Sequence, residues 1–296
     1  MKIKLSDYIA QKVVELGIKH SFSVTGGGAM HLNDSFGHQK NLTTIYNHHE
    51  QACAIAAEAY ARIHNRIALV CVTTGPGGTN AITGVAGGWL DSIPMLIISG
   101  QVRYDWTARS SGVDIRSMGD QEFDICKSVS CMTKYCEMVT DPMRIRYCLE
   151  KAVYLAYSGR PGPSWLDIPL DVQGAYLESD ELIGFDSKAY EAGGDGWMQS
   201  STHKLDEDIA GQGEKRQKLP PKISEELALK IIEKIRQAER PVFNAGNGIR
   251  IAAAHQEFIE LAQKLGIPVV TGWNSEDCIW DTHPLYVGRP GNFGDR

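Results

Sequence analysis

The sequence predicts an α/β fold in which helices flank a parallel sheet, followed by an incomplete second α/β domain. Short apolar runs alternate with stretches of helical period, and the joints between them are short and rich in glycine. One run, 94–99, is apolar nearly throughout. Strands covered on both faces lack the alternation of apolar and polar residues, and alternating strands and helices are typical of parallel sheets between two helical layers.

Composition and charge narrow the class of protein. The chain has 296 residues, enough for two domains, with 43% apolar and 22% charged residues. Its net charge of −6 and lack of a basic block argue against binding to nucleic acid. No apolar run approaches the roughly 20 residues of a membrane helix, and residues 1–6 lack the apolar core of a signal peptide. We therefore expect no membrane association and a cytoplasmic location.

The seven cysteines indicate neither zinc nor disulfides. No Cys-x-x-Cys pair occurs, so metal-ligand spacing is absent. Cys53, Cys71 and Cys148 lie in apolar segments, where a thiol usually acts as a small buried apolar group. We expect reduced, structural cysteines and no metal site in this chain.

The elements of the first domain follow at short intervals. The first helix is expected over 6–17, with Ser6 as N-cap and Gly17 at its end. Further strands are expected at 20–24, 43–46, 66–72, 94–99 and within 160–171, and further helices at 29–36, from 50, at 81–90 and at 141–156. Glycine turns at 26–28 and 75–78 fall at carboxyl ends of strands, where ligands collect in parallel sheets.

The pattern fails over 178–222, which is polar and predicts a linker. Order resumes at Ser224, an N-cap for a helix to about 235. A strand within 240–246, a helix over 252–265 and a strand over 267–271 then begin a second α/β unit, for which 223–296 contains no closing element. The expected domains are therefore 1–177 and 223–296, joined by 178–222.

A carboxylate, Glu50, opens a helix that is otherwise apolar. Partial burial would raise the pKa of this carboxyl and suit it to acid–base chemistry. The alternative interpretation is structural: an acidic residue at the start of a helix compensates the helix dipole. The neighbouring His48 and His49 offer metal ligands, but adjacent side chains diverge in direction. The residues expected to face the core are Ala52, Ile55, Ala56 and Ala59.

Two other glycine patterns are weaker. The triplet at 26–28 after a strand could hold phosphate, although such runs are also common turns. Gly246-Asn-Gly248 resembles the first half of a dinucleotide fingerprint, but Ile251 stands where the third glycine belongs. A nucleotide-dependent oxidoreductase is therefore kept as an alternative.

Taken together, several stretches resemble the thiamine-diphosphate-dependent enzymes of the acetolactate synthase group. In the first domain they are Asn47-His-His-Glu-Gln-Ala52, Ala57-Glu-Ala-Tyr-Ala-Arg62, Thr73-Thr-Gly-Pro-Gly-Gly-Thr-Asn80, Asp91-Ser-Ile-Pro94, Gln121-Glu-Phe-Asp124, Arg160-Pro-Gly-Pro163 and Asp167-Ile-Pro-Leu-Asp-Val172. In the second they are Arg240-Pro-Val242, Gly266-Ile-Pro-Val269 and His283-Pro284. The matches extend through nearly all of the patterned sequence.

The resemblance implies a pyrimidine-binding domain at 1–177 and part of a central domain at 223–296. The family's third domain, which binds diphosphate and Mg²⁺ through Gly-Asp-Gly and a downstream Asn pair, is missing. Gly194-Asp-Gly196 lies in the expected linker without a preceding apolar strand, so we interpret it as chance. We therefore expect a fragment of a longer enzyme that is inactive alone, with Mg²⁺ bound by the missing domain.

The resemblance also implies site residues. Glu50 would hydrogen-bond the aminopyrimidine ring as the catalytic glutamate, and Gln121 would lie near the reacting centre. The positions that match the pyrimidine wall are Thr25, Gly26, Thr73, Gly75, Pro76, Gly77 and Asn80. Thr25 replaces a frequent proline, and Asp120 stands where the family often has an aromatic residue, which favours a polar acceptor such as a keto sugar.

The implied chemistry is decarboxylation and carboligation of a 2-keto acid such as pyruvate, with thiamine diphosphate as cofactor. The implied assembly is a homodimer or homotetramer, because the family builds each site from two subunits. FAD binding stays open, since Gly272-Trp-Asn274 differs from the family's flavin-contacting pattern. A binding or regulatory module that keeps the fold without chemistry is a further alternative.

Overall fold

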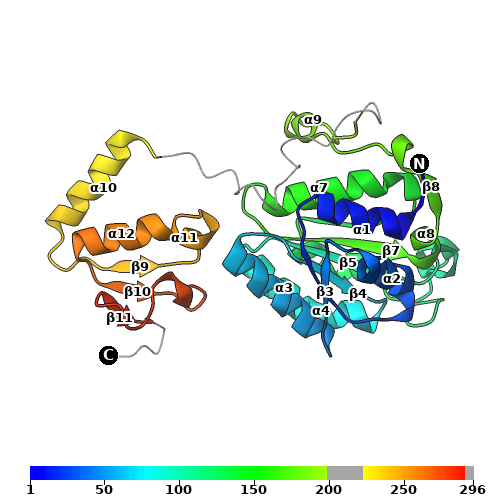
Figure 1. Cartoon of the computed structure of the whole chain (residues 1–296), viewed down its shortest axis with the longest axis horizontal. Helices are drawn as coiled ribbons and strands as arrows, with labels where there is room; N and C mark the ends of the chain where they lie inside the picture. Colours follow the sequence, from blue (N-terminus) through cyan, green and yellow to red (C-terminus); the bar gives the residue numbers. More distant parts are fainter. Residues whose placement is uncertain (199–222, 291–296) are drawn as a thin grey trace. The chain divides into compact units, whose positions relative to one another are not determined.

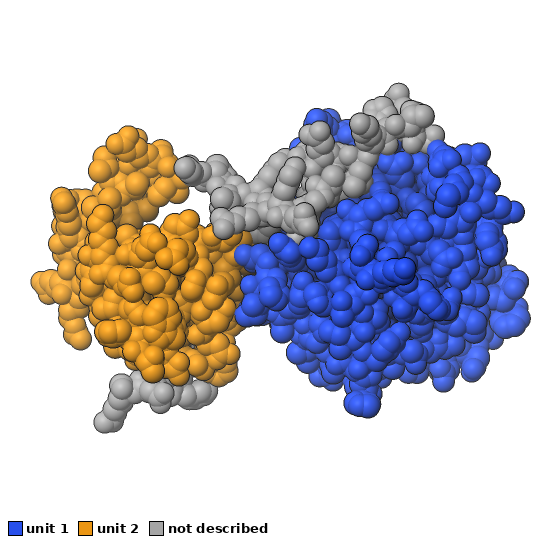
Figure 2. All heavy atoms as spheres, in the orientation of Figure 1, with its two compact units in different colours: residues 1–215 blue, residues 216–296 orange. Residues whose placement is uncertain are grey.

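The computed structural model describes residues 1–198 and 223–290 and divides into two compact units, 1–215 and 216–296 (Figures 1 and 2). Each unit has a sheet and an apolar core of its own. In the described part of the chain, every helix is too short or too polar to cross a membrane.

The first unit is built on a six-stranded sheet in which all neighbouring strands are parallel. The strand order is β3-β2-β4-β5-β7-β6. The strands are β2 (His20–Ser23), β3 (Thr43–Tyr46), β4 (Leu69–Val72), β5 (Met95–Gln101), β6 (Tyr135–Met138) and β7 (Pro163–Pro169). Parallel sheet and flanking helices confirm the predicted fold class.

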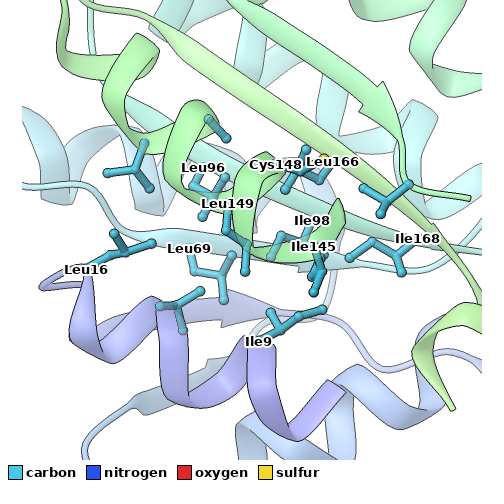
Figure 3. Packing of buried hydrophobic residues seen from close by; sticks show 14 of the residues in the cluster. Ile9, Leu16, Leu69, Leu96, Ile98, Ile145, Cys148, Leu149, Leu166 and Ile168 are labelled. Carbon is cyan, nitrogen blue, oxygen red and sulfur yellow. The ribbon is translucent and has the colours of Figure 1, made fainter. Parts of the chain in front are cut away.

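Helices cover both faces of this sheet (Figure 1). One face carries α1 (Leu5–Glu15), α2 (Met30–His38) and α7 (Ile145–Tyr157), and the other carries α3 (Glu50–His64) and α4 (Pro76–Leu90). Successive residues of a strand point to opposite faces. Accordingly, Leu69 of β4 packs into the first core, whereas Val70 packs into the second. Figure 3 shows the first core, where side chains of α1 and α7 meet those of the central strands.

Two helix starts differ from expectation. Helix α1 begins at Leu5 after Lys4, and the hydroxyl of Ser6, the expected N-cap, is buried and accepts a hydrogen bond from Ser35 Oγ at 2.9 Å. Helix α4 begins at Pro76, within the expected glycine turn and not at 81. Proline suits the first helical position because its φ is already helical and its missing N–H would have no partner there.

Residues 178–198 belong to the first unit, although the sequence predicted a linker from 178. Strand β8 (Tyr176–Glu178) pairs antiparallel with β1 (Lys2–Lys4). Leu182 and Phe185 are fully buried, and Phe185 N donates to the carboxylate of Glu150 on α7 at 2.8 Å. Residues 199–222 of the predicted linker lie outside the described residues.

The second unit contains a three-stranded parallel sheet of order β11-β10-β9. Its elements are α10 (Glu225–Gln237), β9 (Phe243–Ala245), α11 (Gly248–Ile251), α12 (His255–Leu265), β10 (Val269–Thr271) and β11 (Tyr286–Gly288). Ser224 caps α10 as expected, accepting from Leu227 N at 3.2 Å. The remaining short helices are α5 (Ala108–Ser111), α6 (Ile125–Val129), α8 (Leu170–Gln173) and α9 (Ser187–Glu191), with 3-10 turns at Gly27–Ala29, Tyr104–Trp106, Ser130–Met132, Pro142–Arg144, Ser179–Glu181 and Glu276–Cys278.

Candidate active site

The candidate site lies at the carboxyl edge of the six-stranded sheet. The segments that follow β2, β3 and β4 meet there, because carboxyl ends of parallel strands share one edge. These segments carry the turn at 26–28, the start of α3 and the start of α4.

Glu50 is the first residue of α3 and is half-buried. Its Oε2 accepts a hydrogen bond from Asn80 Nδ2 on α4 at 3.0 Å. Within residues 1–198 and 223–290, Glu50 Oε1 takes no hydrogen bond. The adjacent His49 caps α3, since its Nδ1 accepts from Gln51 N at 3.1 Å. One carboxylate oxygen is thus held in place, and the other is available to a ligand.

Thr73 joins the glycine segments beside this carboxylate. Its Oγ1 accepts from Gly28 N at 3.0 Å. A Cβ atom on Gly26 would lie only 2.4 Å from the Cβ of Thr73, and one on Gly77 would lie 2.8 Å from its Cγ2 and 3.5 Å from Glu50 Oε1. Glycine is required at both positions because these backbones pack against a side chain. The wall beside Glu50 therefore consists mainly of backbone.

Gly75 and Gln121 form a second close contact. Gly75 has φ +53° and ψ −110°, a conformation that favours glycine, and a Cβ there would lie 2.0 Å from Gln121 O. Gln121 also has a positive φ, +57°. The carboxylate of the following Glu122 accepts from Ala108 N at 2.6 Å and from Met118 N at 2.7 Å. The loop is thereby folded so that the backbone of Gln121 lies against the start of α4.

The structure thus brings most of the predicted site residues into two neighbouring groups. Glu50, Asn80, Gly77, Thr73 and Gly26 form one, and Gly75 with Gln121 forms the other. Thr25 and Pro76 are exposed and adjoin these groups through the chain.

A buried polar cluster at the same edge was not predicted. Gln101, the last residue of β5, donates from Nε2 to Asp167 Oδ2 at 3.0 Å. Asp167 on β7 also accepts from Ser99 Oγ at 2.6 Å. Burial raises the pKa of the Asp167 carboxyl to about 7, although both hydrogen bonds lower it. Polar residues inside apolar strands were the available signal.

The prediction of which face of α3 is buried is wrong. Cys53, Ala54, Ala57 and Ala61 are the buried residues of this helix. Ile55 is 47% exposed, and Ala52 and Ala59 are exposed as well. Because alanine occurs on every side of the helix, its apolar period fits two directions equally well. The helix therefore presents a second, small-residue apolar face away from the sheet.

Comparison with known families identifies the fold. Residues 3–127 match the thiamine pyrophosphate enzyme N-terminal TPP binding domain, and residues 229–296 match the thiamine pyrophosphate enzyme central domain. Together the two matches cover more than half of the chain. The chain belongs to the thiamine pyrophosphate enzyme family. The first match contains Glu50, the start of α4 and Gln121.

Several curated proteins that are similar to this chain are named acetolactate synthases. The acetolactate synthase large subunit of Corynebacterium glutamicum is 33% identical over 286 residues, which are 97% of this chain and 40% of that protein. An acetolactate synthase of Arthrospira platensis is 32% identical, over 94% of this chain and 43% of its own. A probable large subunit of Methanocaldococcus jannaschii is 30% identical, over 99% and 44%. The chain spans less than half the length of these relatives.

Proposed function

We propose that this chain supplies the pyrimidine-binding side of a thiamine-diphosphate-dependent decarboxylase and carboligase that acts on a 2-keto acid such as pyruvate. The observation that carries the proposal is the Glu50 carboxylate. One of its oxygens is fixed by Asn80, and the other is left for a ligand beside a wall of backbone. An aminopyrimidine fits such a place, since its ring nitrogen pairs with a carboxyl and its flat face needs a wall without side chains.

Each residue has a distinct part in this mechanism. Thiamine diphosphate, when bound, supplies a nucleophilic carbon and an electron sink for decarboxylation. Glu50 holds a proton at the pyrimidine N1′ nitrogen, and Asn80 fixes the direction of the carboxyl group. Gly26, Thr73 and Gly77 bring backbone against the ring and exclude water. Gln121 would lie near the reacting carbon, and Thr25, Gly75 and Pro76 would complete the pyrimidine wall.

We place Mg²⁺ and the diphosphate on a diphosphate-binding domain, which neither family match covers. This chain alone is therefore expected to turn over little substrate.

The visible absorbance of the purified protein tests whether FAD binds. The acceptor is proposed to be polar, because Asp120 is exposed next to Gln121.

Turnover of pyruvate tests the proposal in a protein that joins this chain to a diphosphate-binding domain. Replacing Glu50 by Gln should lower kcat by at least about 100-fold, as expected for a lost acid–base group. Glu181→Gln, at an exposed position of the same unit, serves as the matched control. Equal turnover of wild type and Glu50→Gln would reject the assignment of Glu50, and absence of turnover in the wild type would favour the alternative of a fold without chemistry.

The exposed face of α3 supports the proposed homodimer. Ile55 and Ile63 are 47% and 57% exposed, and small residues between them permit close approach of another helix. Gel filtration tests this. Ile55→Asp should convert dimer to monomer, whereas Met30→Asp, at an exposed position on α2, should not. A wild-type monomer at all concentrations would contradict the proposal.

A further inference from the structure

The side chain of Gln101 makes four hydrogen bonds at the carboxyl end of β5. Its Nε2 donates to Asp167 Oδ2 at 3.0 Å and to Phe123 O at 2.9 Å. Its Oε1 accepts from Val102 N at 3.0 Å and from the hydroxyl of Thr74. An amide has two N–H donors and an acceptor oxygen with two lone pairs, so its hydrogen-bonding capacity is fully used.

Two of these bonds reach the two segments that carry the second group of the candidate site, Gly75 and Gln121. Thr74 directly precedes Gly75 at the start of α4, and Phe123 lies two residues after Gln121. The two segments also touch each other directly, because Gly75 packs against Gln121 O. One buried amide therefore joins the start of α4 to the loop that presents Gln121.

The amide itself is anchored in the sheet. Asp167 is fully buried, and its Oδ1 accepts from Ser99 Oγ at 2.6 Å. Ser99 Oγ in turn accepts from Trp165 Nε1 at 2.8 Å. Because Phe123 O can only accept and Val102 N–H can only donate, Gln101 cannot rotate its amide without leaving like groups facing each other.

We propose that Gln101, anchored by Asp167, is a positioning residue that holds Gln121 against the Gly75 segment in the active site. This rests on the proposed function, since it assigns Gln101 a part in that same site. Gln101 touches no reacting atom in this account. It acts through Thr74 and Phe123. Its loss should therefore slow carboligation and leave the proton exchange that depends on Glu50 nearly unchanged.

Hydrogen exchange of backbone amides tests the positioning role in this chain without any cofactor. In Gln101→Leu, amides in 74–78 and 119–124 should exchange at least about tenfold faster than in wild type, because local opening loses its buried tie. Tyr157→Phe is the matched control. It also removes a buried hydrogen bond, from Ile67 N at 2.7 Å, but at the amino end of β4. Unchanged exchange in both segments of Gln101→Leu would overturn the inference.

Kinetics in the protein that carries a diphosphate-binding domain separates the inference from the proposed function. Gln101→Leu should lower kcat for carboligation by about 10- to 100-fold, the effect of a misplaced group, while proton exchange at thiazolium C2 stays within about threefold of wild type. Equal loss of both activities would contradict positioning of Gln121. A wild type without turnover, combined with faster exchange of the two segments in Gln101→Leu, would reject the proposed function and leave the structural tie intact.

Gln101→Glu provides a conservative rescue. In this variant two carboxyl groups face each other, and they form a hydrogen bond only when one of them holds a proton. Its kcat should therefore recover as pH falls, whereas that of Gln101→Leu should not. The charged and titratable groups near this pair are Asp124 and Arg109, which form an ion pair at 3.1 Å, and the Cys126 thiol, whose pKa Asp167 helps to raise. A pH profile of Gln101→Glu that parallels that of Gln101→Leu would contradict the hydrogen-bonding role.

Discussion

Replacing Gly75 by Ala perturbs the contact on which the loop of Gln121 depends. The added Cβ would lie 2.0 Å from Gln121 O and 3.4 Å from the Cβ of Gln121. The first distance is far inside van der Waals contact, and the obstructing atom belongs to backbone, which cannot rotate away. Either Gly75 or the loop must therefore move.

The expected cost has two parts. A non-glycine residue held at φ +53° and ψ −110° is strained by about 1–3 kcal/mol. The collision with the Gln121 carbonyl adds a further cost of about 1–3 kcal/mol, typical of inserting an atom into a packed site. We expect the free energy of unfolding of the first unit to fall by about 3 kcal/mol in total.

Thermal unfolding of this chain measures the effect. For a unit of this size, about 3 kcal/mol corresponds to a melting temperature lowered by roughly 6–12 °C. Gly27→Ala is the matched control, because Gly27 lies at the same edge of the sheet and a Cβ there meets nothing within 4 Å. The contact between Gly75 and Gln121 would be refuted if Gly75→Ala had the same melting temperature as Gly27→Ala, with a free energy of unfolding within about 0.5 kcal/mol of wild type.

Two further predictions concern buried charge. Because burial raises the pKa of Asp167 to about 7, the ionised form destabilises the fold. Stability should therefore fall as pH rises from about 4 to about 7, by up to roughly 4 kcal/mol, and urea titrations of Asp167→Asn should show a smaller fall. Glu150, fully buried, lies 2.8 Å from Lys12 Nζ and 3.0 Å from Arg146 Nε. Glu150→Gln should cost about 3–5 kcal/mol, and a urea midpoint equal to that of wild type would contradict this.

The sheet could be predicted because its strands are short, apolar and separated by glycine. Strands β4 and β5 are buried on both faces, and such strands are recognisable as unbroken apolar runs. The start of α4 was misplaced because Gly-Pro-Gly-Gly has the composition of a turn. Its role as a first helical turn depends on tertiary contacts, with Thr73 on one side and Gln121 on the other.

The candidate site was predicted in part. Glu50 and the glycine segments were recognisable by family resemblance, and the structure brings Glu50 within hydrogen-bonding distance of Asn80. The Gln101 and Asp167 pair was missed because the two residues lie on different strands, and only the sheet register makes them neighbours. The packing of 178–198 was missed because this segment is irregular, so its buried residues follow no helical or strand period.

The proposed function depends above all on the Glu50 carboxyl group, which holds a proton at the N1′ nitrogen of the pyrimidine ring. The most direct measurement is the rate of hydrogen–deuterium exchange at thiazolium C2, followed by NMR in a protein that joins this chain to a diphosphate-binding domain. We predict that Glu50→Gln slows this exchange by at least about 100-fold, with cofactor still bound. An exchange rate in Glu50→Gln equal to that of wild type, at full cofactor occupancy, would contradict the account.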